Sequence, residues 1–194
     1  MYKVFDNILT TDEQKILNNI FFDTYFPFYF SDAPGYQSVS VSTYNELADK
    51  NTVESEVMIH TFINDDTNQI SNYYEKIQHI LLKFYEKTNI KFSGIIRCKL
   101  NLQHQVSDYN KNSHMCPHVD QNYEHKVLIY YPYTSDGDTF LFNQLSPKEY
   151  EIVDRIEPIG GRFLLMDKMF HAGQPPIRSK TRMSLNYNLI GDYK

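Results

Sequence analysis

Two side chains in the stretch CPHVD, residues 116–120, could hold a metal ion together. His118 and Asp120 are two positions apart, and in an extended strand the side chains at i and i+2 project from the same face. Imidazole nitrogens and carboxylate oxygens are both common metal ligands. The spacing therefore predicts either half of a metal site or an ordinary surface pair of histidine and aspartate.

A third ligand is available in the stretch MDKMFHAGQ, which contains His171. Two histidines and one carboxylate bind an octahedral iron on one side and leave the other positions open for substrate and oxygen. The third ligand must come from a strand that is distant in sequence but lies beside the first two ligands. His171 follows the apolar segment 161–167 by a few residues, so we expect it to meet this requirement.

A possible anion-binding pair lies further along the chain, in the segment 181–190. Arg182 and Ser184 are two positions apart, so in a strand they share a face, which Asn186 continues. An inward-facing arginine is costly to bury unless it pairs with an anion, and a guanidinium beside a hydroxyl suits a carboxylate. Opposite an iron site, this pair suggests a dicarboxylate with one end on the metal and the other on Arg182.

These residues need a scaffold, and the first part of the chain is expected to supply two helices. Apolar residues recur at helical spacing in 13–23, with Thr11 or Asp12 as the N-cap, and again near 67–88. Segment 22–65 is predicted to be irregular, with a turn at Pro34-Gly35. We expect the helices to cover one face of a sheet.

After residue 90 the apolar period changes from 3.6 to 2, which predicts strands. The dipeptides Asp136-Gly137 and Gly160-Gly161 are typical of turns between antiparallel strands. The pattern favours a mainly β jelly-roll or cupin-like barrel backed by two helices. The expected strands are 94–103, 125–133, 138–144, 150–158, 161–167 and 181–190.

Composition excludes several classes of protein. A formal net charge of −5 argues against a general nucleic-acid binder. No apolar run reaches the ~20 residues of a membrane span, and the first ten residues lack a signal-peptide core. Cys98 and Cys116 are too few for a disulfide framework and are expected to be reduced thiols in the cytoplasm. We expect one domain over 1–194, with an N-terminal part over 1–90 and a β core over 91–190.

The order His118-Val119-Asp120, then His171, then Arg182-Met183-Ser184 resembles the iron(II)- and 2-oxoglutarate-dependent oxygenases of the double-stranded β-helix fold. The stretch LIYYPYTSDGDTFLF is similar to the prolyl-4-hydroxylase-like branch, with Gly137, Thr139 and Phe140 as the matching residues. The resemblance covers about 93–190. The rest is more weakly similar to short members encoded by phages and bacteria, which for a phage protein implies the host cytoplasm.

The resemblance implies the following roles. His118, Asp120 and His171 would form the catalytic Fe(II) centre, and 2-oxoglutarate would be the co-substrate with O2. Its 5-carboxylate would pair with Arg182 and Ser184, while Asn101 and Tyr130 would add hydrogen bonds. Ascorbate is a further candidate cofactor. Because Asp120 is a carboxylate rather than the small residue of relatives that halogenate, hydroxylation or a related oxidation is implied.

The substrate implied by the branch is a peptide or protein side chain, with a small molecule as the alternative. The tyrosine-rich segments 22–44 and 104–114 could form an aromatic groove for an extended chain. His114 and His125 flank the motif and are candidate pocket residues. A second class stays open, in which the same ligands hold zinc in a non-catalytic, cupin-like binding protein or a phage structural protein.

Overall fold

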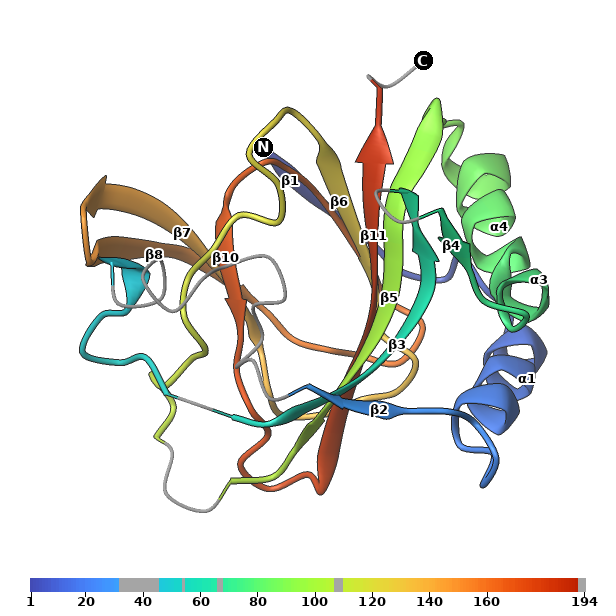
Figure 1. The fold of residues 1–194 in the computed structure, drawn as a ribbon, viewed down its shortest axis with the longest axis horizontal. Coiled ribbons are helices and arrows are strands. Elements are labelled where there is room, and N and C mark those ends of the chain that lie inside the picture. The colour runs from blue at the N-terminus through green and yellow to red at the C-terminus, as the bar shows by residue number, and fades with distance from the viewer. Residues whose placement is uncertain (32–45, 54, 66–67, 107–109, 192–194) are drawn as a thin grey trace.

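The fold consists of two antiparallel sheets with helices on the outer face of the larger one (Figure 1). It was obtained as a computed structural model, which describes residues 1–31, 46–53, 55–65, 68–106 and 110–191. The predicted turn at Pro34-Gly35 lies outside these residues. Among the described residues, no helix is both long enough and apolar enough to cross a lipid bilayer.

Eight of the described strands form the large sheet, and every pairing in it is antiparallel. Seven lie in the spatial order β1-β9-β6-β11-β5-β3-β2, and the short β4 pairs with β3. Their bounds are β1 Tyr2–Phe5, β2 Tyr29–Ser31, β3 Val57–Asn64, β4 Gln69–Ile70, β5 Gly94–His104, β6 Lys126–Tyr130, β9 Phe163–Asp167 and β11 Thr181–Ile190.

The small sheet has the order β10-β7-β8, with bounds β7 Thr139–Ser146, β8 Glu149–Ile156 and β10 Phe170–Gly173. β7 and β8 form a hairpin, whereas β10 pairs with β7 only after the chain has passed through β9 of the large sheet. This exchange of successive strands between two sheets is the jelly-roll arrangement. The predicted fold class, a mainly β jelly-roll with supporting helices, is confirmed.

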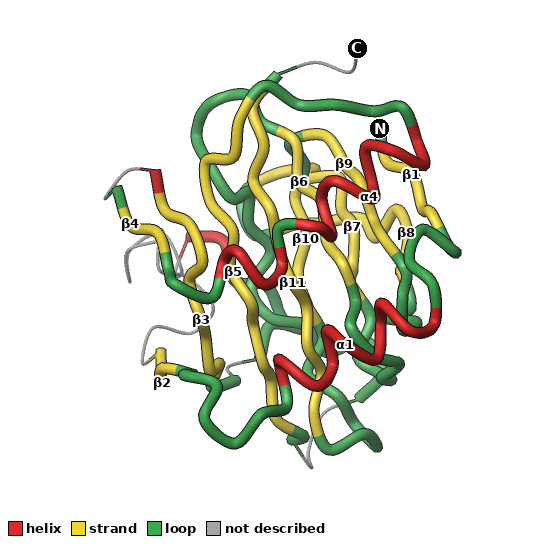
Figure 2. The backbone as a smooth tube through the Cα atoms, turned by 90° about the vertical axis from the view of Figure 1, so that its right-hand side faces the viewer, coloured by secondary structure: helices red, strands yellow, loops and turns green. Residues whose placement is uncertain are grey.

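Helices cover one face of the large sheet, as expected (Figure 2). They are α1 Thr11–Phe21, the single turn α3 Tyr74–Ile77 and α4 His79–Thr88. Phe21 and Phe84 pack into one core with Leu100 of β5 and Leu185 of β11. Each such buried side chain stabilises the fold by about 1.5–3 kcal/mol, and this packing fixes which face of each strand looks inward.

Alternation along β5 decides which of its side chains are free for a site. Cys98 and Leu100 are fully buried on the helix side. The residues that alternate with them, Arg97, Lys99 and Asn101, therefore point to the opposite face, toward the small sheet. The scaffold thus presents a row of polar side chains to the space between the two sheets.

The first helix begins one or two residues earlier than predicted. Thr10, rather than Thr11 or Asp12, is the N-cap: the Glu13 backbone N–H donates to its hydroxyl at 3.2 Å. The Glu13 carboxylate in turn accepts from the Thr10 backbone N–H at 2.8 Å, which completes a capping box. Thr11 and Asp12 are the first two helical residues, so their side chains cannot serve as the cap.

The predicted helix over 67–88 is wrong in its first part. Asn68 has a positive φ of 51°, and Gln69–Ile70 pair with β3 as β4. The Ser71 backbone N–H donates to the Phe62 carbonyl at 2.8 Å. A sheet edge therefore captures this segment, and the helical pattern holds only from Tyr74 onward. The 70% exposure of Ile70 shows that it does not share the buried face of α4.

Segment 22–65 is not irregular throughout, because it contains β2 and the eight-residue β3. The sequence of β3, VMIHTFIN, is mostly apolar and has no clear period of two, so it could not be separated from a buried loop or helix. Its pairing with β5 from Val57 to Asn64 decides its conformation. β1 was also missed, because its four residues YKVF are too few to show a period.

The two predicted turn dipeptides do not join paired strands. Asp136-Gly137 lies between β6 and β7, and Gly160-Gly161 between β8 and β9, so each connects one sheet to the other. The hairpin of the small sheet turns instead between Ser146 and Glu149, where Lys148 has a φ of 65°. Turn residues mark a change of direction but not the partner of the next strand.

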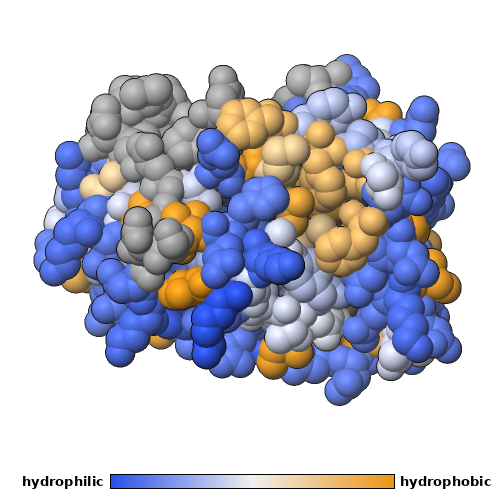
Figure 3. Space-filling model, turned by 90° about the horizontal axis from the view of Figure 1, so that it is seen from below, coloured by the Kyte–Doolittle hydropathy of each residue, from blue (hydrophilic) through white to orange (hydrophobic). Residues whose placement is uncertain are grey.

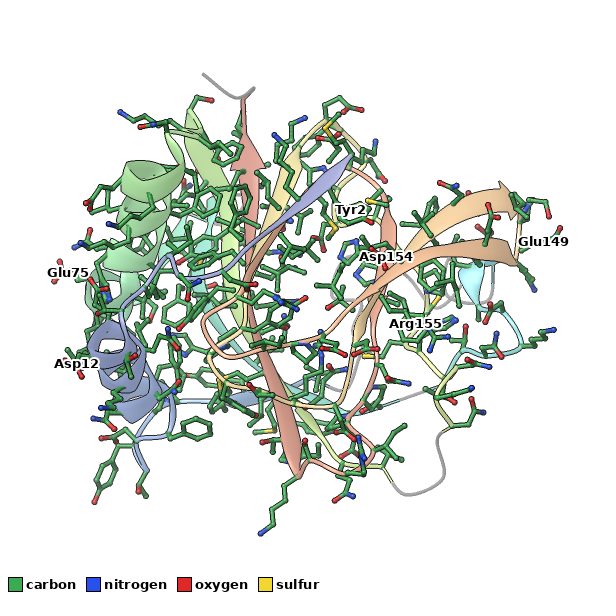
Figure 4. All side chains as sticks on the ribbon, turned by 180° about the vertical axis from the view of Figure 1, so that it is seen from behind. Tyr2, Asp12, Glu75, Glu149, Asp154 and Arg155 are labelled. Carbon is green, nitrogen blue, oxygen red and sulfur yellow. The ribbon has the colours of Figure 1, made fainter. Side chains whose placement is uncertain are left out.

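The small sheet is tied to the rest of the fold by polar contacts (Figure 4). Tyr2 of β1 donates a hydrogen bond from its hydroxyl to the Asp154 carboxylate of β8. Arg155 of β8 donates to the carbonyl of Lys111, in the connection between β5 and β6, at 2.8 Å. These contacts link β8 to β1 of the large sheet and to the connection that follows β5.

We predict that the protein becomes less stable in acid, because two of its histidines are buried. Burial lowers the pKa of both His60 and His114. The unfolded chain therefore binds more protons than the folded one once the pH falls below about 6.5, so the free energy of unfolding decreases. Urea unfolding at pH 7.5, 6.5 and 5.5 measures this directly. A free energy that stays level or rises over that range would contradict the prediction.

Candidate metal and carboxylate site

His118, Asp120 and His171 converge in the space between the two sheets. One ligand atom from each lies within 4.8 Å of the others. The Nε2 atoms of both histidines are 3.8 Å from the Asp120 carboxylate, one from each oxygen. The spacing of the ligand atoms and the mixture of nitrogen and oxygen donors suit one divalent cation.

A pair of backbone hydrogen bonds sets the two histidines opposite each other. The His118 N–H donates to the His171 carbonyl at 3.1 Å, and the His171 N–H returns a bond of 2.9 Å. His118 therefore lies not in a regular strand, as the spacing argument assumed, but in a connection between β5 and β6 that forms one isolated bridge to β10. The bridge brings residues 53 positions apart into register.

Hydrogen bonds behind the rings orient both imidazoles. The Nδ1 atoms of His118 and His171 lie 3.0 and 3.1 Å from the carbonyl oxygens of Cys116 and Met169. A carbonyl only accepts, so Nδ1 carries the proton and Nε2 turns its lone pair toward Asp120. Burial, together with the neighbouring His171, lowers the pKa of His118 to about 4. His118 is thus neutral near pH 7, the form that binds a metal.

Asp120 is held by three side chains that the sequence analysis did not assign to this role. Arg97 donates to one carboxylate oxygen at 3.0 Å, and Asn188 and Asn186 donate to the other at 2.7 and 3.3 Å. Burial opposes ionisation of Asp120, but the nearby His171, Arg97 and His118 and the hydrogen bond from Asn188 hold its pKa well below the usual range. The row of alternate polar residues on β5 and β11 was the signal that could have found them.

Asn188 is the clearest test of how Asp120 is oriented. Asn188→Ala removes the 2.7 Å hydrogen bond, and we expect about 10–100-fold weaker binding of Co(II), because outer partners of metal ligands typically have this effect. Competition with a chelating dye measures the affinity. Asn143→Ala, on the exposed part of β7, is the matched control. Equal affinity in wild type and Asn188→Ala would show that Asp120 needs no such support.

Arg182 lies in the same pocket and is only 4% exposed. It donates to the Gly137 carbonyl at 2.6 Å, the Gln103 side-chain oxygen at 2.8 Å and the Thr139 hydroxyl at 2.7 Å. All three acceptors are neutral. No carboxylate of the described chain lies within ion-pair distance of this guanidinium. Its positive charge is therefore hydrogen-bonded but not neutralised by an anion.

Gly137 makes the seat of Arg182 possible. A Cβ at this position would lie 2.3 Å from the Gln174 carbonyl oxygen and 2.8 Å from Cδ of Arg182. Only glycine lets the backbone approach this closely. Gly137 and Thr139, which carried part of the sequence resemblance, are thus two of the three residues that accept hydrogen bonds from Arg182.

The three other residues predicted to contact the dicarboxylate have different outcomes. Asn101 and Ser184 line the pocket, so their contact with a bound dicarboxylate stays a prediction. Tyr130 was expected there, and this is wrong: its ring packs against Phe163 in the core on the helix side, at 4.9 Å between centroids. The neighbouring Ile129 faces the pocket instead, because adjacent residues of a strand point to opposite faces.

The flanking histidines do not line the pocket. His114 is buried beside Phe140 and Phe142, and its Nε2 lies 3.7 Å from the Asp49 carboxylate. Nδ1 of His125 bonds to a neighbouring backbone carbonyl. Cys98 and Cys116 are both buried and form no disulfide within the described residues.

Lys99 is a pocket residue that the sequence analysis missed. It is 7% exposed and lies between Arg97 and Asn101 in the polar row of β5. Burial, reinforced by the charge of Arg97, lowers the pKa of its ammonium to about 8. The pocket is lined by Val57, Arg97, Lys99, Asn101, Gln103, Met115, His118, Asp120, Ile129, Thr139, His171, Gly173, Arg182, Ser184 and Asn186.

Comparison with known proteins finds likeness in structure rather than in sequence. No protein-family model matches the chain, and no curated protein matches it. An oxidoreductase of the 2OG-Fe(II) oxygenase family from Burkholderia pseudomallei superposes with a TM-score of 0.61 at 14% identity, over 96% of this chain and 84% of that one.

Two solved hydroxylases are similar in the same way. A prolyl hydroxylase from Trichoplax adhaerens, in complex with a hypoxia inducible factor oxygen degradation domain peptide fragment, gives a TM-score of 0.61 at 16% identity, over 97% and 83% of the two chains. A Pseudomonas putida prolyl-4-hydroxylase gives 0.52 at 13% identity, over 98% and 92%. At these identities the likeness shows the fold: this chain has the jelly-roll fold of solved 2OG-Fe(II) oxygenases.

Proposed function

We propose that this protein is an Fe(II)- and 2-oxoglutarate-dependent dioxygenase. The observation that carries the proposal is a single pocket containing both a cluster of two histidines and one carboxylate and a buried arginine with no anionic partner among the described residues. A fold is shared by many activities, so the argument rests on these side chains and not on the superposition alone.

The donor set of the cluster fits iron. His118 and His171 would supply neutral imidazole nitrogens, and Asp120 an ionised carboxylate, which is the facial set of non-haem Fe(II) oxygenases. Bound Fe(II), together with 2-oxoglutarate as a reductant, would activate O2 for oxidation of the substrate. The protein's own residues orient the ligands: carbonyls fix the two rings, and Arg97 and the two asparagines fix the carboxylate.

Arg182 is the proposed partner of the 5-carboxylate of 2-oxoglutarate. Its side chain is buried and held by neutral acceptors, so a carboxylate would neutralise a charge that the protein leaves uncompensated. Ser184 and Asn101, which face each other on β11 and β5, would add hydrogen bonds from between Arg182 and the metal ligands. Ascorbate, as a reductant, belongs to the same proposal.

The proposed reaction is hydroxylation of a peptide or protein side chain, with a small-molecule substrate as the alternative. The Trichoplax hydroxylase with its bound peptide supports a peptide substrate. Exposed aromatic residues also gather on the segment from α1 to β2, and hydrophobic residues form a patch on this lower face (Figure 3). The exposed aromatic residues of this segment are Phe22, Tyr25, Tyr29 and Phe30, each at least 55% exposed. Residues 32–44 and 107–109 of the predicted groove lie outside the described chain.

Visible absorption under anaerobic conditions tests the co-substrate. Chelation of Fe(II) by 2-oxoglutarate is expected to produce a weak charge-transfer band that requires both components, and Zn(II) with 2-oxoglutarate cannot produce it. If folded, iron-loaded protein gives no band, 2-oxoglutarate does not chelate the metal. The cluster would then belong to a non-catalytic metal-binding protein, and the oxygenase proposal would be abandoned.

A further inference from the structure

We propose that Lys99 forms a second anion subsite in the pocket, which binds a carboxylate or phosphate group of the primary substrate. This inference rests on the proposed function, because it takes Arg182 as the subsite for 2-oxoglutarate. It names a chemical class for the substrate: a molecule, or a peptide side chain, with an oxyanion close to the carbon that is oxidised.

Strand register separates Lys99 from Arg182. Lys99 lies opposite Asn186, and Asn186 contacts Asp120, so Lys99 is level with the metal cluster. Arg182 lies opposite Gln103, four residues further along β5, which corresponds to about 13 Å of strand. On the other side of β5, Lys99 lies opposite Thr61 of β3. Lys99 therefore belongs to the metal end of the pocket, away from the seat of the 5-carboxylate.

Lys99 differs from the other two pocket cations in having no partner within the described chain. Arg97 pairs with Asp120 at 3.0 Å, and Arg182 donates to three acceptors. No described residue accepts a hydrogen bond from the Lys99 ammonium or forms an ion pair with it, although the side chain is only 7% exposed. A buried charge without a partner is costly, and a ligand that supplies the partner would remove the cost.

The charge of the pocket favours an anion beyond the co-substrate. The lining carries three cations, Arg97, Lys99 and Arg182, against one carboxylate, Asp120. Fe(II) and the dianion of 2-oxoglutarate would cancel each other, which leaves two positive charges. The 1-carboxylate of 2-oxoglutarate would already be neutralised by the metal. The excess at the metal end is therefore available to the primary substrate.

Three variants test the subsite. Lys99→Met removes the charge with little change in volume, Lys99→Arg keeps it, and Lys91→Met makes the same charge change on an exposed residue before β5. Wild type and variants, loaded with Mn(II) and saturated with 2-oxoglutarate, are titrated calorimetrically with sodium acetate and with inorganic phosphate at constant ionic strength. Acetamide is the neutral control ligand.

We expect acetate or phosphate, but not acetamide, to bind wild type, and Lys99→Met to weaken that binding at least tenfold. Lys99→Arg and Lys91→Met should stay within about threefold of wild type, and affinity for 2-oxoglutarate should change little in all four proteins. Acetate and phosphate distinguish the two oxyanion classes. Metal-free Lys99→Met should also melt at a higher temperature than wild type, because it no longer buries an unpaired charge.

Other outcomes overturn the inference. A tenfold loss of 2-oxoglutarate affinity in Lys99→Met with unchanged anion binding would assign Lys99 to the co-substrate. A lower melting temperature with unchanged binding would make Lys99 a structural residue, and no anion binding by wild type would remove the subsite. If wild type binds no 2-oxoglutarate yet binds phosphate through Lys99, the proposed function fails and the anion subsite stands.

Discussion

Asp120→Asn is expected to bind divalent metal at least a hundredfold more weakly than wild type and to lose 2-oxoglutarate turnover. The substitution keeps the shape of the side chain but replaces a carboxylate ligand with a neutral amide. Loss of a partner behind a ligand typically costs 10–100-fold in metal affinity, so loss of the ligand's charge should cost more. Competition with a chelating dye gives the affinity, and succinate formation gives the turnover.

The Asp120 experiment needs a control for the loss of charge and for folding. Asp154→Asn is matched, because this carboxylate also accepts a side-chain hydrogen bond but lies outside the pocket, on β8. Arg97 loses its ion-pair partner in Asp120→Asn, so the metal-free variant should also be less stable than wild type. Wild-type metal affinity in a folded Asp120→Asn protein would rule out Asp120 as a ligand.

Arg182→Met is expected to weaken 2-oxoglutarate binding about a hundredfold or more while leaving metal binding in the absence of 2-oxoglutarate within a few-fold of wild type. When a buried arginine that pairs with a ligand carboxylate is truncated, the free energy of binding typically weakens by about 2–5 kcal/mol. Arg182→Lys should restore part of the affinity, since it keeps the charge but not the fork of donors that also holds Gln103 and Thr139.

Calorimetric titration of 2-oxoglutarate into Mn(II)-loaded protein measures this effect. Arg178→Met is the matched control, because Arg178 is close in sequence, its side chain is 87% exposed and it pairs with Asp136. Near-normal 2-oxoglutarate affinity in a folded Arg182→Met protein would contradict the assignment of the 5-carboxylate. Equal losses in Arg178→Met would mean that net charge, not the buried contact, governs binding.

The two predictions separate the two halves of the site. Asp120→Asn should remove metal binding and, with it, chelation of the co-substrate, whereas Arg182→Met should affect the co-substrate alone. The separation follows from the register of β11 against β5, which places Arg182 level with Gln103 and Asn188 level with Arg97. A pocket with its anion seat and its cluster at opposite ends suits a ligand that spans both.

Local patterns in the sequence predicted much of this protein. The period of two after residue 90 located all six predicted strands to within a few residues, and the helical period located α1 and most of α4. Strand parity placed Arg182, Ser184 and Asn186 on one face before their partners were known. These features succeed because each depends on residues close together in the chain.

Features that depend on which segments pair were decided by the tertiary structure alone. The bridge between His118 and His171 and the hydrogen bonds of Arg97 and Asn188 to Asp120 all join residues far apart in sequence. The capture of residues 69–70 joins nearer residues, but it too depends on pairing with β3. No local period encodes such pairings. They arise because buried polar groups must find partners wherever the packed strands bring them.

Tyr130 and Lys99 also show that the sequence predicts a strand but not which of its faces lines the pocket. Both lie on strands that the sequence predicts, yet the choice of face was wrong for Tyr130 and unnoticed for Lys99. Alternation fixes that neighbours point apart, but the face that becomes the pocket is decided by where the helices pack. The sequence by itself determined the ligand types, their order and the strands; the packing of α1 and α4 on one face determined which side chains meet in the site.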